Sequence, residues 1–155
     1  MEQSSSLLLK FAQPQWFVPF FIVLWLAASA VMARLGGWRS LSQQFAAASV
    51  PGGQSFRFDS GSTGSTHWPI RYRNCLRVVL ANEGLYVAVM FPFSFQSPAL
   101  QVPWSAFEAV TEKQLFTNRT VTFKVHGHWS AITLSGPLGQ LAKAAYEQRV
   151  VHNEP

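Results

Sequence analysis

The stretch FAQPQWFVPFFIVLWLAASAVMA, residues 11–33, decides the architecture of this chain. It contains no charged residue, and it is bounded by Lys10 on one side and by Arg34 on the other. A helix rises about 1.5 Å per residue, so about 20 residues cross the ~30 Å hydrocarbon layer of a bilayer. The stretch is therefore long enough to span a membrane, and we expect a transmembrane helix over residues 11–35 with a folded domain beside it.

A cleaved signal peptide is the main alternative to an uncleaved anchor. The small residues at 28–30 (ASA) and at 31–33 (VMA) both resemble a cleavage site. However, the region before the apolar core is long and contains Pro14, and the uncharged run exceeds the usual length of a signal core. The sequence therefore favours an uncleaved anchor, followed by a cleaved signal and then by a buried core helix.

Basic residues flank the apolar stretch unequally. Arg34 and Arg39 follow it, whereas Lys10 and Glu2 precede it. Because positive residues near a span stay in the cytoplasm, we expect the C-terminal domain inside and the short N-terminus outside. Amphipathic rings and long basic side chains prefer the membrane interface. The expected interface anchors are Trp16, Arg34, Trp38 and Arg39.

The composition fits one small domain attached to a membrane. Of the 155 residues, 12% are charged and 14% are aromatic, and the net charge is +5. Without the apolar stretch, roughly 115 to 120 residues remain, enough for one core. A basic balance suits an anionic membrane surface or nucleic acid, although basic residues near a span are also topological signals. The single cysteine, Cys75, cannot form an internal disulfide, which fits a reducing compartment.

Changes in composition divide the chain into five segments. We expect a disordered tail (1–10), the transmembrane helix (11–35), a juxtamembrane helix and linker (36–53), a folded domain (54–150) and a short tail (151–155). In the linker, Trp38, Leu41 and Phe45 recur at helical spacing, which predicts a short amphipathic helix over residues 38–49.

Residues 54–134 follow the period of β-strands, and a helix pattern follows them. The longest expected strand, residues 70–80, has Tyr72, Leu76 and Val78 on one face and Cys75 on the opposite face with the arginines. Residues 60–65, rich in Ser and Gly, are expected to form a flexible loop. About six or seven antiparallel strands and a C-terminal helix predict an α+β fold, in which the helix plugs the open end of a bent sheet. Further strands are expected at 56–58, 85–91, 100–102, 107–113, 120–125 and 129–134, and the helix at 137–150.

Several of these segments resemble a known family. They are the hairpin NCLRVVLANEGLYVAVMFPF (74–93) with its EGLY turn, the ALQVPWSAFEAV segment (99–110) with its VPW element, and the juxtamembrane GWRSLSQQF (37–45). Together they are similar to bacterial membrane-anchored pleckstrin-homology-like (PH-like) domain proteins of unknown function. The resemblance covers residues 36–150. It implies a PH-like bent sheet or barrel capped by a C-terminal helix, a binding or adaptor role, and a single-pass protein of the inner membrane.

The same resemblance draws attention to a row of arginines. PH domains that bind phosphoinositides carry a basic pattern of the type K/R-Xn-R-X-R, which Arg57, Arg71 and Arg73 match and Arg77 extends. Arginine binds phosphate bidentately, so the row could read an anionic lipid headgroup. The alternative is a solvated face of an edge strand.

Residues 91–98 (FPFSFQSP) form an apolar segment with two prolines, so they are not a central strand. Three phenylalanines beside two prolines could insert into a bilayer or dock a partner. The alternative is that the loop folds over the open end of the barrel as part of the core. The expected partner or membrane contacts are Phe91, Phe93, Phe95 and Trp104.

No motif in the sequence indicates catalysis. His126 and His128 have a chelating spacing, but a metal site needs three or four ligands. Cys75 with His67 and Asp59 lacks the surroundings of a known cysteine nucleophile. We therefore expect no enzyme activity, metal, cofactor, small-molecule substrate or nucleic acid.

The sequence thus favours a membrane-tethered, non-catalytic adaptor domain that docks a protein partner at the cytoplasmic face of the membrane. Phe93, Phe95 and the groove beside the C-terminal helix are the expected contacts. The alternative function is a reader of anionic lipid headgroups through the arginine row. An enzyme built on Cys75 or on the histidines is the least favoured function.

Overall fold

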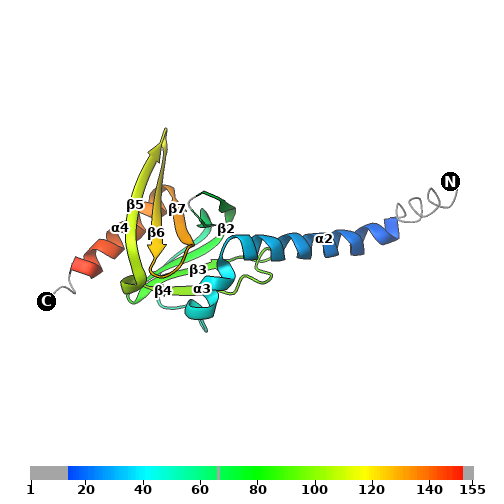
Figure 1. Ribbon diagram of the computed structural model, residues 1–155, viewed down its shortest axis with the longest axis horizontal. Helices are drawn as coiled ribbons and strands as arrows, with labels where there is room; N and C mark the ends of the chain where they lie inside the picture. The colour runs from blue at the N-terminus through cyan, green and yellow to red at the C-terminus, as the bar shows by residue number, and fades with distance from the viewer. Residues whose placement is uncertain (1–13, 66, 152–155) are drawn as a thin grey trace.

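The computed structural model describes residues 14–65 and 67–151 (Figure 1). The expected N-terminal tail and residues 152–155 lie outside the described residues. Within them, an N-terminal helix extends away from a β-rich domain, and a second long helix lies on the opposite side of that domain (Figure 1). This is the α+β arrangement expected from the sequence, with an apolar helix, a bent antiparallel sheet and a C-terminal helix.

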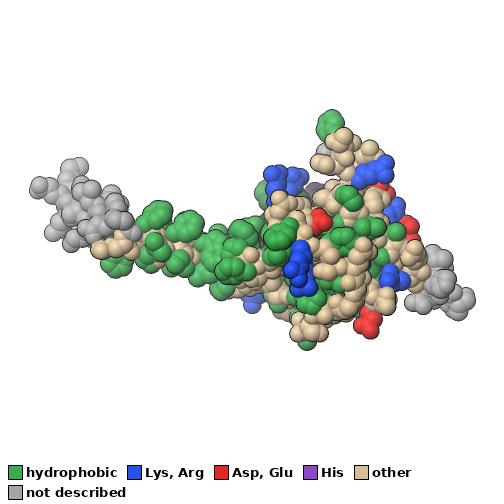
Figure 2. All heavy atoms as spheres, turned by 180° about the vertical axis from the view of Figure 1, so that it is seen from behind, with side chains coloured by type: hydrophobic (Ala, Val, Ile, Leu, Met, Phe, Trp, Pro, Cys, Tyr) green, Lys and Arg blue, Asp and Glu red, His purple; other side chains and the backbone are tan. Residues whose placement is uncertain are grey.

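Helix α2 (Pro14–Leu35) corresponds to the apolar stretch. Residues Gln15–Leu35 have a mean hydropathy of 2.1, and they form one helix that is long and apolar enough to cross a membrane. Only 11% of its most apolar window is buried, whereas the core helix of a soluble protein is mostly buried. Figure 2 shows hydrophobic side chains along the whole described length of α2. Because α2 is mostly exposed, it is not a buried core helix of this domain.

Helix α3 (Trp38–Phe45) follows after a sharp corner and is shorter than the predicted 38–49. Gly37 forms the corner in the left-handed region, with φ 67°, which favours glycine. The helix ends at Phe45 because the next residue joins the sheet edge, where Ala46 forms an antiparallel bridge to Leu100. Trp38 and Leu41 are fully buried beneath the sheet.

Seven strands form one antiparallel sheet in the order β4-β3-β2-β1-β7-β6-β5. The central strand β1 pairs with β2 on one side and with β7 on the other, and this strand continues to Gly64 through the residues expected to be a flexible loop. Small residues are needed there, because a Cβ on Gly61 would lie 2.6 Å from the Thr133 carbonyl oxygen. The strands are β1 (Gly53–Gly64), β2 (Pro69–Ala81), β3 (Gly84–Val89), β4 (Leu100–Pro103), β5 (Phe107–Leu115), β6 (Asn118–Val125) and β7 (Ala131–Ser135).

Helix α4 (Gly136–Val151) covers the open end of the bent sheet, as the sequence predicted. A 3-10 turn, η1 (Trp104–Ala106), lies beneath it. Tyr146 of α4 packs edge-on against Phe107 and Phe123, with ring centroids 6.3 and 6.5 Å apart. Burying aromatic rings removes a large apolar area from water, so this cluster fixes α4 on the sheet.

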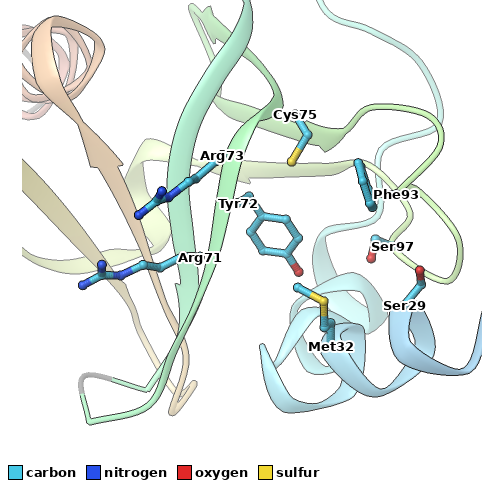
Figure 3. A pocket seen from close by; sticks show the side chains of 8 residues that line it. All are labelled: Ser29, Met32, Arg71, Tyr72, Arg73, Cys75, Phe93 and Ser97. Atoms are coloured by element: carbon cyan, nitrogen blue, oxygen red, sulfur yellow. The ribbon is translucent and has the colours of Figure 1, made fainter. Parts of the chain in front are cut away.

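Strand β2 is irregular at its middle, and this changes which side chains share a face. Asn74 has φ 52°, and the register with β1 shifts between the pair Asp59–Leu76 and the pair Gly61–Tyr72. Cys75 was expected on the face of the arginines. Instead, it packs against the core cluster, pointing to the same side as Tyr72 (Figure 3). A left-handed residue interrupts the strict alternation of a strand, and the sequence pattern could not reveal it.

Candidate functional site

The aromatic loop, defined here as residues 91–98, connects β3 to β4 and lies beside the last turns of α2 (Figure 1). Its backbone turns twice, with Phe93 N–H donating to Met90 O and Ser97 N–H donating to Ser94 O, each at 3.0 Å. Its phenylalanines stay exposed: Phe91 by 87%, Phe93 by 48% and Phe95 by 41%. The alternative that these phenylalanines belong to the core is therefore wrong, and α4 covers the open end of the sheet.

The aromatic loop lies beside the part of α2 around Ser29. The loop and Ser29 line the same pocket. Ser29 precedes Leu35 by about 9 Å along the helix axis, and α2 is about 33 Å long in all. Since the hydrocarbon layer is ~30 Å thick, a bilayer that encloses α2 reaches the level of the aromatic loop.

The four expected interface anchors do not behave alike. Trp16 at the start of α2 is 54% exposed, and Arg34 and Arg39 are exposed near its end. Trp38 is not an anchor, because it is fully buried and its indole Nε1 donates to Pro98 O at 2.6 Å. Its amphipathic ring finds an internal acceptor in the aromatic loop instead of the membrane interface.

Trp104 is not a surface contact either. Only 5% of it is exposed, and its Nε1 donates to Ala81 O at 3.1 Å. The guanidinium of Arg149 stacks over its ring at 5.6 Å. Trp104 is therefore a core residue that joins η1, β2 and α4, and the expected partner contact at this position is wrong.

The arginine row is split into two pairs by the irregularity at Asn74. Arg57 faces Arg77 directly across β1 and β2, and the Nε atom of Arg77 is buried without a hydrogen-bond partner. Arg71 and Arg73 are exposed nearer the start of β2, and they point away from Tyr72 and α2 (Figure 3). Among the described residues, none of the four arginines pairs with a carboxylate.

A pocket of about 180 Å³ lies between α2, β2 and the aromatic loop (Figure 3). Burial raises the pKa of the Tyr72 phenol and also that of the Cys75 thiol, so both groups are neutral at physiological pH. A neutral thiol is a weak nucleophile, which gives no support to an enzyme built on Cys75. The sequence missed this pocket because the turn at Asn74 brings Cys75 to it. The lining residues are Ser29, Met32, Arg71, Tyr72, Arg73, Cys75, Phe93 and Ser97.

A second hollow, of about 390 Å³, lies beside α4 and is bordered by Leu80, Asn82 and Leu141. Arg149 also borders it and hydrogen-bonds Asn82 Oδ1 at 3.0 Å. This is the groove beside the C-terminal helix that the sequence predicted as a partner contact. It borders α4, which lies on the opposite side of the domain from α2, whereas the aromatic loop lies beside α2 (Figure 1).

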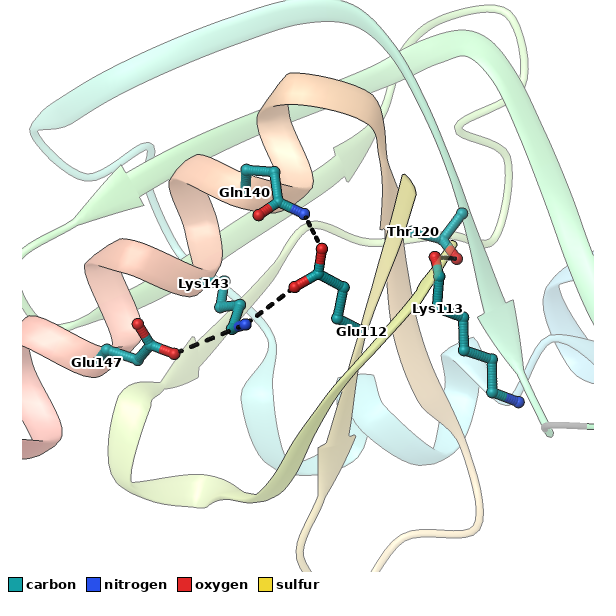
Figure 4. Close-up of polar contacts among 6 residues, drawn as sticks. All are labelled: Glu112, Lys113, Thr120, Gln140, Lys143 and Glu147. Carbon is teal, nitrogen blue, oxygen red and sulfur yellow. Dashed lines mark hydrogen bonds and ion pairs between the residues drawn. The ribbon is translucent and has the colours of Figure 1, made fainter. Parts of the chain in front are cut away.

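The remaining polar contacts hold elements together. Glu112 on β5 accepts hydrogen bonds from Lys143 Nζ at 2.9 Å and from Gln140 Nε2 at 2.8 Å, both on α4 (Figure 4). These bonds lower the pKa of the Glu112 carboxyl and raise the pKa of the Lys143 ammonium. They fasten the edge strand to the helix.

The two histidines with chelating spacing are not joined at one site. His128 hydrogen-bonds Ser40 Oγ at 3.0 Å and Gln44 Oε1 at 2.9 Å, which ties α3 to the turn between β6 and β7. Over residues 14–65 and 67–151, no three His, Cys, Asp or Glu side chains lie close enough to hold a metal ion.

No protein-family model matches this chain, and no curated protein sequence matches it.

Proposed function

We propose that the chain is a single-pass, membrane-anchored PH-like domain that binds without catalysing a reaction, and that the aromatic loop seats it in the membrane surface. The observation that carries this proposal is the position of the loop beside the last turns of α2, with Phe91, Phe93 and Phe95 exposed. Exposing three phenylalanines to water is unfavourable. Burying each ring at the boundary between headgroups and acyl chains removes its apolar area from water.

The basic residues support the same orientation and an anionic surface. Arg34 lies in the last turn of α2 and Arg39 in α3, which follows it, and Arg71 and Arg73 come from a strand that borders the last turns of α2. Positive residues close to a span favour the cytoplasmic side, and each is worth about 1 kcal/mol near an anionic leaflet. We infer a domain on the cytoplasmic face of the bacterial inner membrane, where Arg71 and Arg73 contact anionic headgroups.

Spin labels on the full chain in nanodiscs test the loop. In a Cys75→Ser background, Phe95→Cys is labelled and compared with Phe116→Cys. Phe116 is a matched control because it is 94% exposed but lies at the tip of the β5–β6 hairpin, which projects sideways from the domain (Figure 1). We expect the label at position 95 to be accessible to oxygen and shielded from a soluble nickel chelate, and the label at 116 to behave in the opposite way.

The arginines are tested in the same nanodiscs. Replacing Arg71 and Arg73 with alanine should remove the difference in loop depth between phosphatidylglycerol and phosphatidylcholine discs at low salt, because the contact is electrostatic and screened. Alanine at Lys113 and Arg119, which lie on β5 and β6, should leave that difference unchanged. A label at position 95 that the nickel chelate reaches freely would refute the proposal.

Docking of a protein partner is the second candidate function, and the groove beside α4 favours it. That groove faces away from α2, carries the half-exposed Leu141, and is bordered by the cation of Arg149. A partner there would approach from the cytoplasm and would not compete with the membrane. If the nickel chelate reaches the label at position 95, the aromatic loop lies in water, and docking of a protein partner becomes the favoured function.

A further inference from the structure

The pocket between α2, β2 and the aromatic loop shares Phe93, Arg71 and Arg73 with the proposed membrane contact, but that contact does not use the interior of the pocket. Its volume is about 180 Å³, and an apolar cavity of about 150 Å³ holds a molecule the size of benzene. Met32, Cys75, the ring of Tyr72 and Phe93 give it an apolar lining. Its size and lining therefore suit a short length of hydrocarbon chain.

One polar group is aimed into this pocket. Tyr72 is only 5% exposed, and its hydroxyl oxygen is buried without a hydrogen-bond partner among the described residues. Figure 3 shows the phenol pointing toward Met32 and Ser29. The neighbouring Thr63 hydroxyl opposes the rise in the Tyr72 pKa that burial causes, but no hydrogen bond of normal geometry joins the two groups. A buried hydroxyl without a partner is costly, so it favours a ligand that supplies an acceptor.

The depth of the pocket identifies the class of ligand. Ser29 and Met32 place it about one to two helical turns inside the end of α2. In a ~30 Å hydrocarbon layer that encloses the ~33 Å of α2, this level lies just inside the boundary between hydrocarbon and headgroups. The groups found there are the first carbons of phospholipid acyl chains, each chain attached to an ester carbonyl at the boundary.

We propose that this pocket binds the ester-linked start of a phospholipid acyl chain, with the Tyr72 hydroxyl donating a hydrogen bond to the ester carbonyl. The aromatic loop closes the pocket on one side through Phe93. Arg71 and Arg73 border the pocket, but their side chains point to the opposite side (Figure 3). The site therefore recognises the acyl ester and does not select the charge of the headgroup. This inference rests on the proposed function, in which the aromatic loop contacts the membrane.

Photocrosslinking of the full chain in nanodiscs tests the site. Two phosphatidylcholine probes carry a diazirine on one acyl chain, either beside the ester or beside the terminal methyl group. We expect the ester-proximal probe to label residues around Cys75 and Phe93, and the methyl-proximal probe to label only the exposed face of α2. Doping the discs with phosphatidylglycerol should not change the pocket label.

Two variants test whether the Tyr72 hydroxyl donates the proposed hydrogen bond. Tyr72→Phe keeps the ring and removes the donor, so the pocket label should fall roughly fivefold, as for the loss of one hydrogen bond. Thr63→Val is the matched control, because it removes the neighbouring hydroxyl without touching the lining, and it should leave the label unchanged. The label on exposed α2 residues such as Phe17 and Phe21 serves as an internal standard in every sample.

The outcomes separate this inference from the proposed function. If the label at position 95 is deep but neither probe reaches Cys75, the pocket is not a lipid site and the membrane seat stands. Equal pocket labelling by both probes, or an unchanged label in Tyr72→Phe, also overturns the inference. An aqueous label at position 95 overturns the inference and the proposed function together.

Discussion

At the scale of single residues, the two buried indoles show how the aromatic excess is used. Trp38 and Trp104 each donate a hydrogen bond to a backbone carbonyl far away in the sequence, at Pro98 and at Ala81. An indole gives both a large apolar surface and one donor, so it packs and orients a loop at once. The Trp38 bond fixes the end of the aromatic loop on α3.

Replacing Trp38 with Phe should therefore loosen this loop as well as the core. The change leaves the Pro98 carbonyl unpaired and shrinks a side chain that is fully buried, so we expect the free energy of unfolding to fall by about 2 kcal/mol. Urea unfolding of the full chain in micelles measures it. Trp129→Phe is the control, because Trp129 is 56% exposed and its replacement should leave the midpoint unchanged.

At the scale of elements, the attachment of α4 to β5 predicts a dependence on pH. The hydrogen bonds from Lys143 and Gln140 lower the pKa of Glu112 below its ordinary value, so their contribution is complete above the unfolded pKa and is lost as the pH falls through the folded pKa. Glu112→Gln should lower the urea midpoint near pH 7, and the difference from the native chain should vanish in acid. Glu108→Gln is the control, because Glu108 pairs with Lys124 of β6 and not with α4. A difference that does not shrink as the pH falls would contradict this account.

The elements themselves were largely predictable, because their periods come from local chemistry. The helical pattern over residues 137–150 predicted α4, and the alternation of Tyr72, Leu76 and Val78 predicted a buried face of β2, and the structure confirms both. Two kinds of feature were not predictable. The left-handed turn at Asn74 breaks the alternation inside an otherwise regular strand pattern; asparagine adopts this conformation more readily than most residues but does not require it. Contacts between distant segments, such as Trp38 with the aromatic loop, depend on the packing of the whole domain and leave no local pattern.

At the scale of the whole molecule, the corner at Gly37 joins α2 to the domain and sets the level of the aromatic loop along α2. A Cβ on Gly37 would lie 2.6 Å from the Cβ of Ser130, and the residue has φ +67°. Ala33, one turn earlier, is only 1% exposed against the domain. These contacts hold the domain in one orientation relative to α2, and the proposed membrane contact of the aromatic loop depends on that orientation.

Gly37→Ala should consequently displace the domain as well as destabilise it. The left-handed backbone costs an alanine about 1–2 kcal/mol, and the contact with Ser130 forces the corner to open. Gly127→Ala separates the two effects, because Gly127 has φ +73° but nothing within 4 Å of an added Cβ. We expect both variants to lose stability, and only Gly37→Ala to bring the spin label at position 95 into contact with the nickel chelate. If Gly127→Ala exposes that label equally, the depth of the loop depends on general stability and not on the corner at Gly37.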